Sequence, residues 1–139
     1  MSNIPLSKRK PTRIDFFDKA IDLRVKIVEY IGLDFKDDNW VTVRIRNDIY
    51  RATQDLLYAL TQANTIYITT MYEYNERRRY MTRAIGDCEY IIQEIQFAIR
   101  SYGIKPTKYA LLVKDLEVLI MSIKNWRKSD NSVMKKLKG

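Results

Sequence analysis

The sequence predicts an all-α protein, an antiparallel four-helix bundle in up-down-up-down order. Apolar residues recur every three or four positions in four segments of the chain, which is the period of one helix face. The connections between these segments are short. Residues 40–46 alternate apolar and polar like a strand, but they would have no partner strand elsewhere in the sequence. We therefore expect these residues to be helical as well.

The first helix is expected to begin at a capping box formed by Thr12 and Asp15 and to end at Gly32. Residues 33–39 then connect it to the second helix, with Asp38 or Asn39 as the N-cap. The apolar row that follows the first cap predicts the side that faces the core, and it consists of Ile14, Phe17, Ile21, Val25 and Val28.

The second helix is expected from about residue 40 to 73. Its main apolar row has heptad spacing and predicts the core-facing side: Ile45, Ile49, Ala52, Leu56, Ala59, Ala63 and Ile66. A second row, offset from the first, is Leu57, Leu60, Asn64, Ile68 and Met71. Either one wide core-facing surface takes up both rows, or the second row contacts another copy of the chain. The candidate oligomer interface is therefore Leu57, Leu60, Ile68 and Met71.

Residues 74–76 interrupt the pattern, and two further helices follow. The third carries the apolar row Met81, Ile85, Cys88, Ile91, Ile95, Ala98 and Tyr102. Gly103 is expected to stop it in a left-handed conformation, and Pro106 to open the fourth helix. The fourth row is Tyr109, Leu112, Leu116, Leu119, Ile123 and Trp126, and polar residues 129–132 are expected to end the helix. This divides the chain into a basic flexible arm (1–12), the bundle domain (13–130) and a basic flexible tail (131–139).

The net charge of +8 is concentrated at the two ends of the chain. Residues 77–83 add an internal cluster of arginines with no acid among them. Lysine and arginine bind polyanions by releasing condensed counterions, so these segments indicate a nucleic-acid-binding protein. The alternative is that the ends and the helix start are only solvated. The candidate nucleic-acid-binding residues are Lys8, Arg9, Lys10, Arg77, Arg78, Arg79, Arg83, Lys124, Arg127 and Lys128.

The composition argues against catalysis and against a metal or other cofactor. The chain has no histidine and one cysteine, which excludes Cys-His and Ser-His mechanisms, the usual zinc sites and a disulfide scaffold. Cys88 falls on a buried row, and the carboxylate pairs Asp87 with Glu94 and Asp115 with Glu117 occupy outward helix positions. Tyr74 and Tyr80 are placed to stack on bases, whereas the core explains Tyr50, Tyr67, Tyr102 and Tyr109. We expect a non-enzymatic protein, soluble and cytoplasmic because no apolar run is long enough to span a membrane.

Three stretches resemble a family of small bacterial and phage four-helix bundles. They are RIRNDIYRATQDLLYALTQAN (44–64), RRRYMTRAIGDCEYIIQEIQFAIRSYGI (77–104) and KYALLVKDLEVLIMSIKNWRKSD (108–130). The family includes the proteins encoded in ribosomal RNA intervening sequences and the accessory variability determinants of diversity-generating retroelements. The likeness covers residues 13 to 130.

The resemblance implies a non-enzymatic adaptor that assembles as a ring, with five copies the implied number. It also implies binding to RNA or DNA and to a retroelement reverse transcriptase, in support of mutagenic cDNA synthesis. Two alternatives stay open. One is a stand-alone RNA-associated bundle of the intervening-sequence type, and the other is a purely structural oligomer that binds no nucleic acid.

Overall fold

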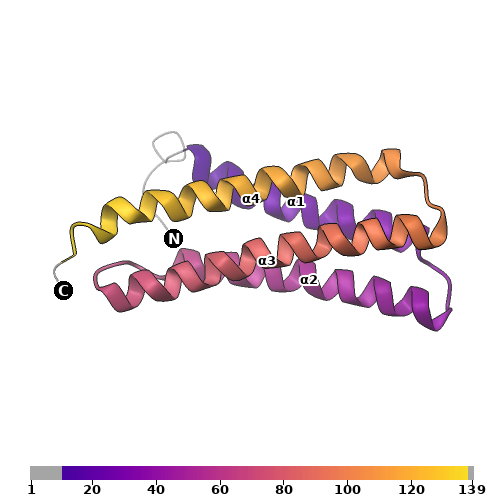
Figure 1. Ribbon diagram of the computed structural model, residues 1–139, viewed down its shortest axis with the longest axis horizontal. Coiled ribbons are helices and arrows are strands. Elements are labelled where there is room, and N and C mark those ends of the chain that lie inside the picture. The colour runs from indigo at the N-terminus through magenta and orange to yellow at the C-terminus, as the bar shows by residue number, and fades with distance from the viewer. Residues whose placement is uncertain (1–10, 138–139) are drawn as a thin grey trace.

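Four helices contain most of residues 11–137, the part of the chain that the computed structural model describes, with side chains described from residue 16 onward. Each helix runs antiparallel to the one before it (Figure 1). α2 packs against α3, α3 against α4, and α1 against both α4 and α2. This confirms the all-α up-down bundle. The helices are α1 (Pro11–Asp34), α2 (Trp40–Thr65), α3 (Met71–Tyr102) and α4 (Pro106–Met134).

α2 begins where the strand-like stretch begins, so the helical interpretation of residues 40–46 is confirmed. Asn39 is its N-cap, as predicted, because the Asn39 side chain accepts a hydrogen bond from the backbone nitrogen of Val41 at 2.9 Å. The start of α1 differs from the prediction. The helix already includes Pro11, so Thr12 is a helical residue and not the cap before the helix, and α1 continues past Gly32 to Asp34.

The junction between α2 and α3 lies earlier than predicted. α2 ends at Thr65 instead of near residue 73, and α3 begins at Met71. A capping box fixes the new start: the Thr70 hydroxyl accepts from the backbone nitrogen of Glu73, and the Glu73 carboxylate accepts from that of Thr70. The capping motif is present in the sequence. Ile66 and Met71, however, continue the two apolar rows of the second helix, which led to the prediction that this helix runs past the motif.

The ends of the last two helices follow the expected chemistry. Gly103 stops α3 with φ of 63°, in the left-handed region that favours glycine, and Pro106 occupies the first turn of α4. α4 does not stop at residues 129–132 but continues to Met134. Helical structure therefore passes the predicted domain end at residue 130. The Ser132 hydroxyl bonds to the carbonyl of Ser129, within the helix.

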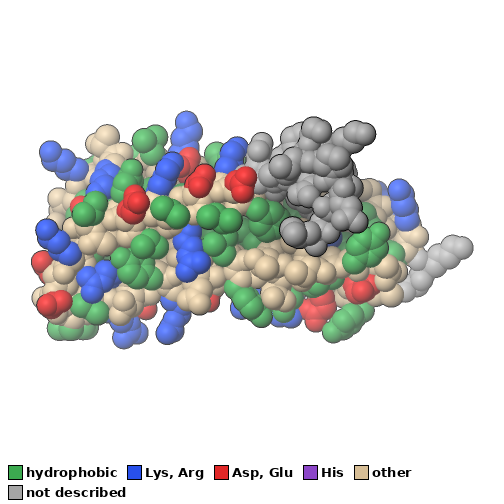
Figure 2. Space-filling view, turned by 180° about the vertical axis from the view of Figure 1, so that it is seen from behind, with side chains coloured by type: hydrophobic (Ala, Val, Ile, Leu, Met, Phe, Trp, Pro, Cys, Tyr) green, Lys and Arg blue, Asp and Glu red, His purple; other side chains and the backbone are tan. Residues whose placement is uncertain are grey.

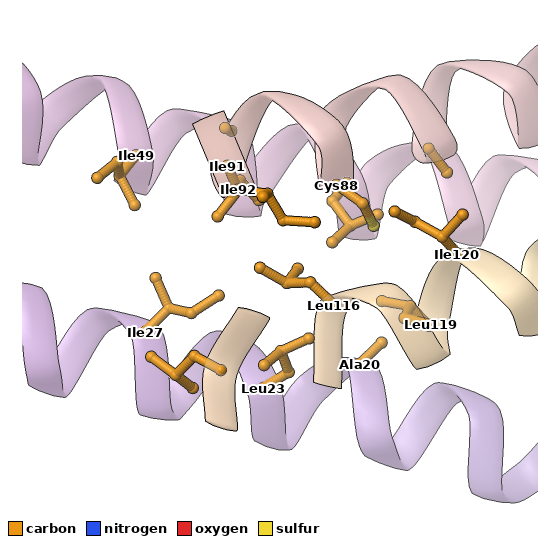
Figure 3. Close-up of a cluster of buried hydrophobic side chains, with 14 of the residues drawn as sticks. Ala20, Leu23, Ile27, Ile49, Cys88, Ile91, Ile92, Leu116, Leu119 and Ile120 are labelled. Carbon is orange, nitrogen blue, oxygen red and sulfur yellow. The ribbon is translucent and has the colours of Figure 1, made fainter. Parts of the chain in front are cut away.

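All four helices contribute to one apolar core. Figure 3 shows Leu23 and Ile27 of α1 turned toward Ile49 of α2, Ile91 of α3 and Leu116 of α4. The predicted rows of α2, α3 and α4 supply most of the buried side chains, which confirms those three faces. The exceptions are Ile66, Ile85 and Trp126, which are half-buried, and Tyr102, which is 40% exposed.

The predicted core face of α1 is wrong. Ile21 and Val25 are each 51% exposed and Val28 is 37% exposed. The row that faces the core is instead Phe16, Ala20, Leu23, Ile27 and Ile31, and Phe35 continues it into the connection. Both rows have helical spacing. With Phe35 included, the buried row carries more apolar volume than the predicted row, and it continues to the end of the helix, whereas the predicted row stops at Val28.

Candidate nucleic-acid interface

Two basic segments that are far apart in the sequence meet at one end of the bundle. The first part of α3 lies beside the last part of α4, at the end where α2 and α3 are joined (Figure 1). Several side-chain contacts join them, and these include the following two hydrogen bonds. The Arg127 guanidinium donates to the Thr82 hydroxyl at 3.3 Å, and the Tyr74 hydroxyl donates to the Asn131 side chain at 2.7 Å. The arginines of residues 77–83 are therefore neighbours of the cations of residues 124–128.

Arg77 belongs to the interior. It is 8% exposed and forms an ion pair with Asp130 at 3.0 Å. Its guanidinium lies 4.7 Å from the centre of the Trp126 ring and donates to the carbonyl of Ile66 at 3.3 Å. A side chain held in this way does not reach a phosphate on the surface. We therefore remove Arg77 from the predicted nucleic-acid-binding residues.

Arg78 and Tyr74 are also held by the contact between α3 and α4. The Arg78 guanidinium is half-buried and donates to the Tyr74 hydroxyl at 3.1 Å and to the Asn131 side chain at 3.3 Å. Tyr74 is only 6% exposed, so its ring is not available to stack on a base, and that prediction is wrong. These side chains align the two helices, and Arg78 reaches the surface only in part.

Arg79 and Arg83 share one face of α3, as the sequence predicts, and both are exposed. Their guanidinium carbons lie 4.8 and 5.8 Å from the centre of the Tyr80 ring, so they cover the aromatic surface expected to stack on bases. Arg79 also forms an ion pair with Glu76 at 2.8 Å. This pair is exposed, and such pairs are worth at most about 1 kcal/mol, so a phosphate can replace Glu76.

The cations of α4 complete the surface. Lys124 and Lys128 are exposed and Arg127 is half-buried. Because Arg127 contacts Thr82 in an antiparallel pair of helices, Lys124 and Lys128 lie within about one helical turn of Arg83 and Arg79 along the bundle. We call Arg79, Arg83, Lys124, Arg127 and Lys128 the basic end. The remaining predicted cations, Lys8, Arg9 and Lys10, lie outside the described residues, as does most of the predicted arm.

The four residues of the predicted oligomer interface do not form one exposed surface. Leu60 has an exposed fraction of 0% within the single chain, so it belongs to the core. Leu57 is half-buried and packs against the same core. Ile68 and Met71 are half-buried in the α2–α3 connection and at the start of α3. The wide core-facing surface of α2 thus takes up Leu57 and Leu60.

Exposed apolar residues lie elsewhere, on α1 and α4. The α1 stripe is Ile21, Val25 and Val28. The α4 stripe is Leu111, Val118 and Met121, with exposed fractions of 69%, 48% and 56%. Figure 2 shows apolar side chains in several groups on the face that α1 and α2 form, with Lys and Arg between them. Helical spacing predicted that the first stripe faces the core, whereas no sequence pattern singled out the second.

The titratable side chains in the interior offer little chemistry. Cys88 is completely buried, and burial raises the pKa of its thiol to about 12, so it is protonated near neutral pH. Among the side chains that the structure describes, in residues 16–137, there is no group of three or more suited to hold a metal ion. Nor does this part of the chain contain a helix long and apolar enough to cross a membrane.

The predicted carboxylate pairs are arranged differently in the structure. Asp87 interacts with Asp55 of α2, and Glu94 interacts with Asp48 of α2, so Asp87 and Glu94 do not form a pair with each other. Burial and, second, Asp55 raise the pKa of Asp87 to about 6. Burial and Asp48 also raise the pKa of Glu94. Asp115 and Glu117 are exposed on α4.

Comparisons of the chain with protein-family models, with curated proteins and with solved structures find no match. The four-helix architecture therefore rests on the structure itself. The resemblance to the intervening-sequence and accessory variability determinant family stays a prediction.

Proposed function

We propose that this chain is a non-enzymatic nucleic-acid-binding protein that acts as a homo-oligomer. The observation that carries the proposal is the basic end, where cations of α3 and α4 meet. Residues 77–83 and 124–129 contain no acidic side chain. Exposed Lys and Arg attract phosphates and release the counterions condensed on a nucleic acid. Arg79 contributes as well, because a phosphate can replace Glu76 in its exposed ion pair. Such a surface binds with strong salt dependence and little preference for base sequence.

Oligomer formation is supported by the α1 stripe and the α4 stripe. They lie on different helices of one protomer, so the first can contact the second of a neighbouring copy. A contact between two different surfaces repeats from copy to copy and closes into a ring when the rotation allows it. The resemblance implies five copies. In such a ring the basic end repeats, so several weak phosphate contacts add up through multivalency.

The resemblance extends the proposal to a partner, a retroelement reverse transcriptase with its RNA. In that role the oligomer supports mutagenic cDNA synthesis by holding template and enzyme together. The stand-alone RNA-associated bundle is the second candidate, and the basic end favours it equally. The two candidates differ in one assay, cDNA synthesis by a diversity-generating reverse transcriptase with and without this protein. Stimulation supports the first candidate, and RNA binding without stimulation supports the second.

RNA binding is tested by fluorescence anisotropy with a labelled single-stranded RNA over a series of salt concentrations. The variant Arg79→Gln with Arg83→Gln should bind more weakly and flatten the slope of log affinity against log salt by about 1.4, since each lost phosphate contact removes about 0.7 for a single strand. Lys26→Gln with Lys36→Gln is the matched control, because both lysines are exposed and lie outside the basic end. Equal losses in the two variants would contradict a specific role for the basic end.

Assembly is tested by light scattering at micromolar concentration. Val25→Glu places a charge in the α1 stripe, and Val118→Glu places one in the α4 stripe, so each should dissociate the oligomer on its own. Gln93→Glu, on the exposed side of α3 and outside both stripes, introduces the same charge and should not. A wild-type protein that is monomeric would overturn the oligomer. An oligomer that survives both stripe variants would place the interface elsewhere.

A further inference from the structure

The outer seam between α2 and α3 carries a repeating pattern that the proposed function does not use. Two contacts fix the register of these antiparallel helices. The Thr42 hydroxyl donates to the Tyr102 hydroxyl at 3.3 Å near one end, and Arg77 donates to the carbonyl of Ile66 at 3.3 Å near the other. Residues of α2 and α3 whose numbers add up to about 143 therefore lie at the same level.

Two pairs of carboxylates face each other across this seam. Asp48 lies level with Glu94, and Asp55 lies level with Asp87. The members of each pair interact electrostatically, which is one reason why the pKa values of Glu94 and Asp87 are raised. On each helix the two acids are seven residues apart. Like charges held together in this way repel each other. Arg44 forms an exposed ion pair with Asp48 at 3.4 Å, and Arg83 acts against the raised pKa of Asp87, so each carboxylate pair is compensated in part. A further cation placed between the two carboxylates of a pair would remove the remaining repulsion.

Exposed aromatic side chains alternate with these pairs. Tyr58 is 53% exposed, Tyr90 is 43% exposed and Phe97 is 54% exposed. Opposite each of these aromatic residues, at the same level of the bundle, the other helix carries an exposed arginine. The residues that form these levels again recur every seven positions along each helix. The three levels are Arg44 with Phe97, Arg51 with Tyr90, and Tyr58 with Arg83.

Along the seam, carboxylate pairs therefore alternate with aromatic–arginine pairs. Two successive carboxylate pairs are seven residues apart on each helix, which is about 10.5 Å at a rise of 1.5 Å per residue. That distance is also the separation of every seventh residue on another α-helix. A helix laid along the seam thus presents one side chain to each carboxylate pair. Its neighbouring side chains meet the aromatic residues, the side-chain type that most often anchors protein interfaces.

The charge of the seam favours a protein over a nucleic acid as the occupant. Its four carboxylates outnumber the arginines at the three aromatic levels, and they stand between those levels, where a phosphate backbone would be repelled. The basic end has the opposite character, and Arg83 lies where the two surfaces meet.

We propose that the α2–α3 seam is a docking surface for an α-helix of a partner protein that carries Lys or Arg at every seventh position, with apolar residues beside them. The cations lie between Asp48 and Glu94 and between Asp55 and Asp87. The apolar residues pack on Tyr58, Tyr90 and Phe97. The nucleic acid and the partner helix then occupy adjoining faces of the same bundle, with Arg83 at the boundary between them.

The test uses the full chain and a labelled three-heptad helical peptide with Lys at one heptad position and Leu beside it. A second peptide carries Glu in place of each Lys. We expect the Lys peptide to bind with saturation in fluorescence anisotropy and the Glu peptide not to bind. Asp55→Asn with Asp87→Asn should weaken binding of the Lys peptide at least tenfold. This variant removes a repulsion, so it should be at least as stable as the wild type, and urea unfolding checks this.

The matched control is Asp115→Asn with Glu117→Gln, which removes the same charge from the exposed side of α4 and should leave binding unchanged. Tyr90→Ala should weaken binding without unfolding the protein, because its ring is largely exposed. Three results would overturn the proposal: no binding of the Lys peptide, equal binding of both peptides, or equal losses in the two acid variants. A Tyr90→Ala variant that loses RNA affinity and keeps peptide affinity would assign the seam to nucleic acid instead.

Discussion

Replacing Asp130 by Asn should destabilise the bundle by about 3 to 5 kcal/mol, because it removes a carboxylate that pairs with the buried guanidinium of Arg77. The side chains of Arg77 and Asp130 are only 10% and 7% exposed, and they approach to 3.0 Å. The Trp126 ring covers the guanidinium from one side. Water therefore cannot take the place of the lost carboxylate. The substitution keeps the shape of the side chain and removes only its charge.

The magnitude follows from the geometry. Two unit charges 3.0 Å apart attract each other by about 5.5 kcal/mol at an effective dielectric constant of about 20. The amide dipole of Asn and the hydrogen bond from Arg77 to the carbonyl of Ile66 retain part of this stabilisation. A loss of about 3 to 5 kcal/mol is a large share of the 5 to 15 kcal/mol that is typical of a folded domain.

Urea unfolding followed by circular dichroism measures this effect. With a slope of about 2 kcal/mol per molar urea, the midpoint should fall by about 1.5 to 2.5 M. Asp48→Asn is the matched control, because it removes the partner of Arg44 from an exposed pair at 3.4 Å and should cost at most about 1 kcal/mol. Arg77→Met with Asp130→Leu removes both charges and should recover most of the lost stability.

Two results would refute this reasoning. Equal midpoint shifts for Asp130→Asn and Asp48→Asn would mean that burial does not strengthen the pair. A double variant as unstable as Asp130→Asn would mean that the cost arises from lost packing and not from an uncompensated charge.

Three further predictions concern single residues. Gly103→Ala should lower the free energy of unfolding by about 1 kcal/mol because φ is 63° there, whereas Gly86→Ala, inside α3 with open space around it, should raise it by up to about 1 kcal/mol; urea midpoints compare them. Cys88 should react with a thiol reagent only when the bundle opens, so rapid labelling of the native protein would contradict its burial. The pKa of Asp87 is about 6 in the folded chain and 3.8 when the side chain is exposed, so protonation of Asp87 stabilises the fold as the pH falls from 7 toward 4. Asp87→Asn should therefore raise the urea midpoint at pH 7.5 more than at pH 4.5.

Helical periodicity predicted three of the four helix faces because α3 and α4 each have one row that clearly suits the core, and the wide core-facing surface of α2 takes up Leu57 and Leu60 of its second row as well. α1 has two rows of similar spacing, and the sequence alone did not decide between them. Which row is buried depends on how α1 packs between α2 and α4, and the Tyr50 hydroxyl of α2 already contacts the carbonyl of Val28 on the other side. The available signal was the continuation of the buried row past Val28, to Ile31 and Phe35.

The sequence shows which residues of the basic end are charged, but it does not show which of these charges are buried. The basic end was therefore predicted only in part. Arg77, Arg78 and Arg79 are chemically alike in the sequence and differ in the structure. Arg77 is buried because Asp130 lies opposite it, more than fifty residues later in the chain. In the sequence, Asp130 lies in the polar run 129–132, which predicted the end of the fourth helix. Only the continuation of α4 to Met134 reveals it as a partner in the core.

The same ion pair also aligns the basic end. Near residue 130, α4 is held on α3 by directional polar contacts, from Arg77 to Asp130 and from Tyr74 to Asn131. Such contacts fix the register of the helices, and so the distance between the cations of α3 and those of α4. Asp130→Asn therefore has two opposite effects on RNA binding. It raises the net charge by one, which alone would strengthen binding.

It also loosens the alignment of the cations, which should weaken binding. We expect the second effect to prevail, with lower affinity at a temperature where circular dichroism shows the variant to be folded. Arg77→Met with Asp130→Leu leaves the net charge unchanged, so it separates alignment from charge. Stronger RNA binding by Asp130→Asn would mean that the cations of α3 and α4 bind phosphates independently, and that the register of the two helices does not matter for the basic end.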